Sequence, residues 1–136
     1  MNFVRMKVQL NRIDGAYQMK AINESGKEGI LDGGKGGFTP MQILLAAVAS
    51  CTVVDIVDIL TKQKQDLLDI KVNVEGQRVE NAQVKPFKAI QLHYELFGNI
   101  EDKKAQRAIE LALSKYCSVG ASLDPTIEKT FTYKVM

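Results

Sequence analysis

Residues 39–62 read TPMQILLAAVASCTVVDIVDILTK, and this stretch decides how the rest of the chain must fold. Thr39 can cap free backbone N–H groups, Pro40 suits the first helical position, and Gln42 completes a capping box. Fifteen of the 20 residues from Met41 to Leu60 are apolar. We therefore predict a helix from Pro40 to about Lys62 that is buried on most of its sides.

A run of this length also raises the possibility of a membrane span, which needs about 20 apolar residues. Asp55 and Asp58 lie within the run. Two carboxylates are costly in lipid, and the sequence offers no second span. We therefore expect a central core helix and no membrane partner.

The residues before this helix alternate between polar and apolar side chains. The alternation predicts strands at residues 4–10 and 17–21, separated by a turn at Asp14-Gly15, and a third short strand at residues 29–31. A glycine-rich loop at residues 32–37 follows. Lys35 lies in it without the Gly-Lys-Ser/Thr ending of a phosphate-binding loop, so we expect a flexible loop near the active site.

The residues after the helix repeat this alternation and then change period. Strands are predicted at 70–74 and 90–96, a second helix should be capped by Asn99 and stop near Cys117, and a last strand covers 127–135. The apolar stripe of the second helix consists of Ala105, Ala108, Ile109, Ala112 and Tyr116. The order βββ-α-ββ-α-β predicts an α+β fold with antiparallel sheets, in one domain spanning residues 1–136.

Bulk composition excludes several classes of protein. The 136 residues are 46% hydrophobic and 25% charged, which argues against disorder. A net charge of +2 gives no reason to expect nucleic acid as a partner. The first residues lack the apolar stretch of a signal peptide, so we expect a cytoplasmic protein whose thiols are kept reduced.

The two cysteines are the strongest candidates for chemistry. Cys51 lies between Ser50 and Thr52, three turns into the apolar helix, and Cys117 lies 66 residues later. Free cysteine often behaves as a small buried hydrophobe, whereas a pair in a reducing compartment is more often transient and catalytic. An active thiol needs a nearby cation or N–H donors, and Asp55, one turn from Cys51, would oppose ionisation. Both interpretations stay open on this evidence.

Other polar residues offer weaker signals. His93 lies on the polar face of a predicted strand, and a single histidine without other ligands makes a poor metal site. Asp55, Asp58 and Lys62 share one helical stripe, which indicates a polar seam or an interface ion pair. Asp55 could also orient groups around Cys51.

Two separated motifs together resemble one known family. Residues 39–52, TPMQILLAAVASCT, and residues 115–119, KYCSV, are similar to the two cysteine motifs of the OsmC/Ohr family of osmotically induced and organic-hydroperoxide-resistance proteins. The order of the motifs, their spacing and the final Thr/Tyr-rich strand agree over nearly the whole chain. The resemblance implies the OsmC-like fold, with the long apolar helix at the centre of an intertwined homodimer.

The resemblance also implies a function. It implies a cysteine-based peroxidase, in which Cys51 is the peroxidatic thiol, Cys117 is the resolving thiol, and a dithiol reduces the resulting disulfide. The substrate would be a peroxide, especially an organic hydroperoxide, and no metal or organic cofactor is implied. The alternative is a non-catalytic OsmC-like dimer that binds an apolar ligand or senses oxidation.

One departure from the family pattern favours this alternative. The well-characterised branches carry a glutamate ten residues before the reactive cysteine, paired with an arginine. Met41 occupies that position here, with Gln42 beside it, and Arg5 and Arg12 have no clear alignment with the arginine. The pattern Cys-Thr-x-x-Asp at residues 51–55 resembles a less-studied OsmC-like branch.

Overall fold

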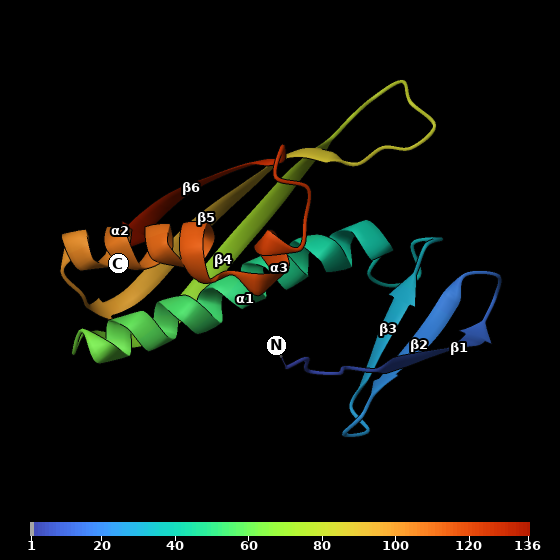
Figure 1. Cartoon of the computed structure of the whole chain (residues 1–136), viewed down its shortest axis with the longest axis horizontal. Helices are drawn as coiled ribbons and strands as arrows, with labels where there is room; N and C mark the ends of the chain where they lie inside the picture. The colour runs from blue at the N-terminus through green and yellow to red at the C-terminus, as the bar shows by residue number, and fades with distance from the viewer. Residues whose placement is uncertain (1) are drawn as a thin grey trace. The chain divides into compact units, whose positions relative to one another are not determined.

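The computed structural model describes residues 2–136, which form two compact units, one ending at Leu44 and the other running from Leu45 to Met136. The first unit contains an antiparallel sheet in the order β1-β2-β3 (Figure 1). Its strands are β1 (Val8–Asp14), β2 (Gln18–Asn23) and β3 (Glu28–Asp32). The first predicted strand thus starts four residues later than expected, because Val8 already pairs with Asn23, where β2 ends.

The long helix α1 (Pro40–Lys62) has the predicted bounds and the predicted capping box. The Gln42 N–H donates to Thr39 Oγ1 at 3.3 Å, and the Thr39 N–H donates to Gln42 Oε1 at 3.0 Å. By length and composition α1 could cross a membrane, since its most apolar 18-residue window has a mean hydropathy of 2.3. Its buried residues form one stripe: Val48, Ala49, Thr52, Ile56 and Leu60.

The expectation that α1 is buried on most sides is wrong for the single chain. Only 28% of its most apolar window is buried, and Val54 and Val57 are 60% and 37% exposed. One face of α1 covers the core of the second unit, while the opposite face is not covered by the other described residues of that unit.

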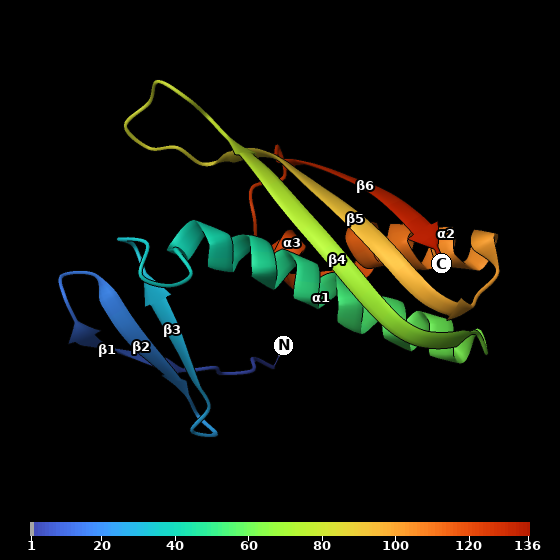
Figure 2. The same cartoon turned by 180° about the vertical axis from the view of Figure 1, so that it is seen from behind.

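The second unit contains a sheet in the order β4-β5-β6, formed by β4 (Asp66–Arg78), β5 (Phe87–Asn99) and β6 (Glu128–Val135). One face of β5 forms the centre of the core through Ile90, Leu92, Tyr94 and Leu96, all at most 1% exposed. Figures 1 and 2 show α1 and α2 on the same side of this sheet.

One strand direction differs from the prediction. β4 and β5 are antiparallel as expected, but β5 and β6 are parallel. The helical segment between β5 and β6 carries the chain back along the sheet, so β6 runs in the same direction as β5. Residue alternation does not encode strand direction, which is why the sequence did not reveal this.

The second helical segment has three parts: α2 (Asp102–Leu111), a π-helical turn η1 (Ala112–Tyr116), and the short α3 (Ser118–Ala121). The predicted cap is wrong, because Asn99 is the last residue of β5 and Glu101 is the N-cap residue. The Glu101 N–H instead donates a hydrogen bond to Gln65 Oε1 at 2.8 Å. The apolar stripe is buried as far as Ala112, but Tyr116 is 47% exposed.

A candidate dithiol site

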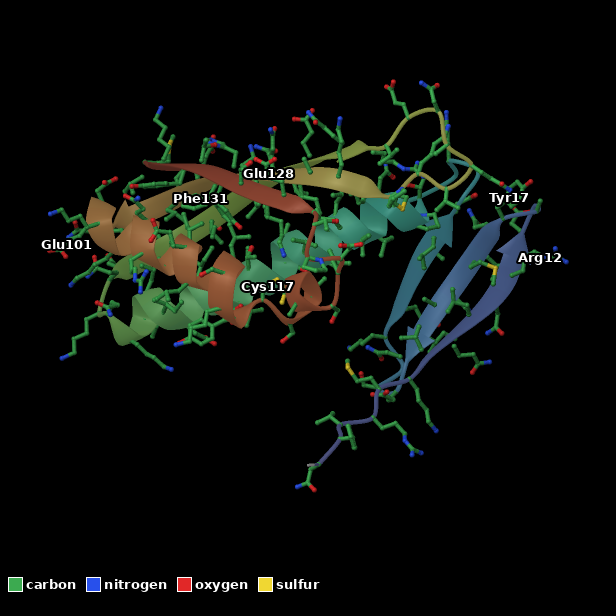
Figure 3. The ribbon with its side chains drawn as sticks, turned by 45° about the horizontal axis from the view of Figure 1, so that its top comes forward. Arg12, Tyr17, Glu101, Cys117, Glu128 and Phe131 are labelled. Atoms are coloured by element: carbon green, nitrogen blue, oxygen red, sulfur yellow. The ribbon has the colours of Figure 1, made fainter. Side chains whose placement is uncertain are left out.

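The structure brings the two cysteines together. Cys51 is half-buried on α1, and Cys117, 5% exposed, follows η1. Both are free thiols, and the Cys51 side chain lies close enough to Cys117 to raise the pKa of that thiol. In Figure 3 Cys117 lies beside α1, the helix that carries Cys51. A residue pair separated by 66 positions in the sequence thus forms a dithiol inside the second unit.

The π-helical turn sets the position of Cys117. The Cys117 N–H donates to Ala112 O at 2.9 Å, a bond that spans five residues where an α-helix spans four. Such π-helical turns are rare in proteins overall, but those that occur often lie at functional sites. Directly after this turn, the Gly120 N–H donates to Cys117 Sγ at 3.2 Å. The sulfur therefore has a fixed backbone donor.

Lys129 is a functional candidate that the sequence reasoning missed. It lies on β6 opposite Ile90, half-buried, and its Nζ donates to Gly120 O at 3.3 Å. A Cβ built on Gly120 would lie 3.1 Å from Lys129 Nζ and 3.3 Å from Cys117 Sγ. The ammonium group and the thiol therefore border the same small space.

A signal for Lys129 was present in the sequence. The apolar residues Ile127, Phe131, Tyr133 and Val135 alternate along the last strand, and Lys129 falls in the same inward register. A lysine at a core-facing position is uncommon unless its charge has a role or a partner.

The electrostatics of Cys117 combine opposing influences. Burial raises the pKa of the Cys117 thiol, and the neighbouring Cys51 side chain raises it further. The Gly120 N–H and the Lys129 ammonium lower the Cys117 pKa, but they do not outweigh burial. Cys117 therefore holds its proton more strongly than an ordinary cysteine while Cys51 lies beside it.

A buried hydroxyl pair borders the same region. Thr52 Oγ1 donates to Ala49 O at 2.7 Å, so it accepts the hydrogen bond from the Tyr94 hydroxyl, also at 2.7 Å. Burial raises the pKa of Tyr94 to about 12, and the nearby Cys117 contributes to the increase. Tyr94 is therefore a neutral neighbour of the dithiol over the physiological pH range.

Asp55 lies one turn along α1 from Cys51, as the sequence predicts. Among residues 2–136, its Oδ2 is the one buried side-chain oxygen or nitrogen without a hydrogen-bond partner. Burial raises the pKa of Asp55, and the charge of Asp58 raises it further. The Asp55 carboxyl therefore keeps its proton to a higher pH than an ordinary aspartate does.

Asp55 also lines a pocket of about 320 Å³ with Asp58, Lys62, Leu111 and Tyr116. The polar seam predicted along α1 thus borders this pocket. The ion pairs formed within residues 2–136 do not join Lys62 to either aspartate.

The remaining sequence candidates are either engaged in other hydrogen bonds or exposed within their own unit. Gln42 is occupied by the capping box. Arg5 and Arg12 are exposed side chains of the first unit. His93 bonds through Nδ1 to Thr132 Oγ1 at 2.6 Å. Across residues 2–136, no three metal-ligating side chains lie close enough together to hold an ion.

Comparison of the chain with known proteins identifies its family. Residues 32–131 match the model of the family described as OsmC-like protein. The chain belongs to the OsmC-like protein family. The resemblance drawn from the two cysteine motifs and the predicted α+β class are both confirmed.

This OsmC-like protein is similar to several individual proteins. It is 35% identical over 115 residues to Protein YhfA of Escherichia coli strain K12, covering 82% of this chain and 85% of YhfA. It is similar to the structure of a hypothetical protein from Aquifex aeolicus VF5, with 29% identity, a TM-score of 0.88 and 98% coverage of both chains.

A third relative shares the fold at lower identity. This is an organic hydroperoxide resistance protein OsmC from Legionella pneumophila, with 19% identity, a TM-score of 0.73, and coverage of 99% of this chain and 100% of that one.

Proposed function

We propose that this OsmC-like protein is a thiol-dependent peroxide reductase, in which Cys51 reacts with the peroxide and Cys117 resolves the oxidised product. The observation that carries the proposal is the proximity of two free thiols from distant segments, since Cys51 lies close enough to Cys117 to raise its pKa. A peroxide or redox function also suits the family, since a protein with this fold is named for organic hydroperoxide resistance.

Exposure and proton affinity support this division of roles. Cys51 is half-buried, so peroxide reaches it more easily than Cys117, which is 5% exposed. The raised pKa of Cys117 keeps this thiol protonated, so its S–H can donate a hydrogen bond to a Cys51 thiolate. Stabilising a thiolate in this way promotes attack, because the thiolate is the nucleophilic form.

The proposed cycle transfers two electrons from a dithiol to the peroxide. The Cys51 thiolate attacks the O–O bond and becomes a sulfenic acid, and the alkoxide or hydroxide that leaves takes up a proton. Cys117 then attacks the Cys51 sulfur, the S–O bond breaks, and the Cys117 proton leaves with the hydroxide as water. An external dithiol reduces the disulfide through a mixed disulfide.

The proposed conditions follow from this chemistry. The cycle uses no metal or organic cofactor. The proposed location is the cytoplasm, where thiols are kept reduced. Met41 cannot supply the carboxylate found in the well-characterised branches, so the hydrogen bonds around the dithiol must provide the activation.

We also propose that the protein is a homodimer whose second copy covers the exposed face of α1. This face carries Ala46, Ser50, Val54 and Val57, which are exposed in the single chain. Exposed apolar side chains on so apolar a helix leave considerable hydrophobic area in water, and a second copy with the same face would cover it.

A peroxide-consumption assay with dithiothreitol tests the catalytic proposal. The wild type should consume an organic hydroperoxide, and Cys51→Ser should lose at least about 100-fold in rate, because the nucleophile is gone. Cys117→Ser should still form a sulfenic acid on Cys51, detectable with a dimedone-type reagent.

The same assay separates the competing functions. If the wild type consumes peroxide no faster than Cys51→Ser, the enzyme proposal is wrong and the ligand-binding or redox-sensing alternative gains support. Titration of the native thiols without denaturant tests the remaining alternative, that both cysteines are inert core residues, because such thiols would not react.

A further inference from the structure

We propose that Lys129 is the positioning cation of the resolving cysteine: it stabilises the Cys117 thiolate and so promotes the closing and reopening of the disulfide, but not the first oxidation of Cys51. This inference rests on the proposed peroxidase function. It assigns a role to a half-buried lysine that neither cysteine motif contains, since β6 lies outside residues 39–52 and 115–119.

The backbone of Gly120 fixes the positions of the Cys117 thiol and the Lys129 ammonium group. Its N–H donates to Cys117 Sγ at 3.2 Å, and its C=O accepts from Lys129 Nζ at 3.3 Å. One peptide segment therefore fixes the sulfur and the ammonium group. Because Gly120 has no side chain, nothing of its own separates them: a Cβ there would lie 3.1 Å from Nζ and 3.3 Å from Sγ.

The strand keeps the ammonium group on the core side of the sheet. Lys129 pairs with Ile90 in the parallel ladder of β5 and β6, and Ile90 is fully buried. Partial burial leaves the ammonium less screened by water, so its attraction for a nearby thiolate is stronger than at the surface. Its ammonium group bonds Gly120 O and lies close enough to Cys117 to lower the pKa of that thiol, whereas Cys51 approaches Cys117 from α1.

Three titratable groups face Cys117: Cys51 from α1, Tyr94 from β5 and Lys129 from β6. Tyr94 stays neutral, so the balance depends on the other two. While Cys51 is a thiolate, it favours the protonated form of Cys117. Once Cys51 has become a neutral sulfenic acid, that influence is lost, and Lys129 together with the Gly120 N–H then favours the Cys117 thiolate.

This change places the effect of Lys129 late in the cycle. After oxidation, the Cys117 thiolate forms the S–S bond while hydroxide leaves Cys51 and is protonated to water. In the reductive half, a reductant thiolate attacks the Cys51 sulfur, and Cys117 leaves with the electron pair of the S–S bond. A more stable thiolate leaves faster. Lys129 promotes both steps by stabilising the same anion.

Rapid-mixing kinetics of charge-altering variants test the inference. Lys129→Met and Lys129→Gln remove the charge, Lys129→Arg keeps it, and Lys134→Met is a matched control on an exposed position of β6. Sulfenic acid formation on Cys51, measured with Cys117→Ser present, should change by less than about twofold. Disulfide formation in the neutral variants should slow about three- to tenfold, with its pH profile moved to higher pH.

The outcomes separate the inference from the proposed function. Cys117→Ser protein that forms no sulfenic acid on Cys51 would overturn the peroxidase proposal itself. Suppose instead that the wild type cycles normally and that Lys129→Met and Lys129→Gln form the disulfide with the wild-type rate and pH profile. This result would overturn the role of Lys129 and leave the peroxidase proposal standing. Equal slowing of sulfenic acid formation would do the same, because the lysine would then act on Cys51. Rescue by Lys129→Arg supports the role of charge over packing.

Discussion

At the scale of single residues, the dithiol site depends on a glycine, Gly120, which has no side chain to fill the space between its neighbours. Gly120 is buried, and its small size lets the Cys117 thiol and the Lys129 ammonium share one space. Its backbone also contributes a donor to one group and an acceptor to the other. The chemistry of Cys117 therefore depends on a residue that carries no functional group of its own.

Gly120→Ala should disturb the site without unfolding the protein. The new Cβ requires Lys129 Nζ and Cys117 Sγ to move by a few tenths of an ångström, and the end of a lysine side chain moves easily. With the ammonium displaced, the Cys117 thiol should ionise at higher pH, measured from the ultraviolet absorbance of the thiolate with Cys51→Ser present. Gly29→Ala is the control, because nothing lies within 4 Å of its Cβ position. An unchanged titration of Cys117 would show that the two groups do not share space as described.

At the scale of secondary-structure elements, α1 combines a reactive face with an electrostatic cost. Cys51 and Asp55 lie one turn apart on it, and Asp55 Oδ2 is buried without a partner. A buried, unpaired carboxylate destabilises the folded state, which is consistent with the raised pKa of Asp55. The helix retains this residue in spite of the cost.

The cost of Asp55 should depend on pH in a defined direction. Because burial and Asp58 raise the folded-state pKa above the ordinary value of 3.8, Asp55 favours folding below that value and disfavours it as the pH rises through the raised pKa. Asp55→Asn should therefore be more stable than the wild type at neutral pH by about 1 kcal/mol. The advantage should shrink in acid. Urea unfolding at several pH values measures it, with the exposed Asp66→Asn as control. A constant difference at all pH values would contradict this assignment.

At the scale of the whole molecule, one face of α1 is not covered by the other described residues of the second unit. Val54 and Val57 are 60% and 37% exposed, although the most apolar 18-residue window of the helix has a mean hydropathy of 2.3. A homodimer through this face would remove these side chains from water and would account for so apolar a helix.

Light scattering during size-exclusion chromatography should detect this dimer, and Val54→Glu should weaken it. In a monomer the substitution would change stability by less than about 0.5 kcal/mol, because the residue is exposed. In the dimer it would bury an unpaired charge. Val84→Glu is a matched control on a residue that is 76% exposed. A wild-type protein that elutes as a monomer at micromolar concentration would contradict the proposal.

The sequence by itself determined the elements whose cause is local. The capping box at Thr39 and Gln42 and the run of apolar residues predicted α1 to the residue. Alternation located every strand, because side chains two positions apart lie on the same face of a strand whatever surrounds it. The two cysteine motifs also identified the family.

Only the tertiary structure decided how distant segments meet. The direction of β6, the π-helical turn before Cys117, and the approach of Lys129 to that thiol depend on the path of the chain between β5 and β6. The contact of Cys117 with Cys51 joins residues 66 positions apart. Local periodicity contains no information on such contacts, because they form only when the core is assembled.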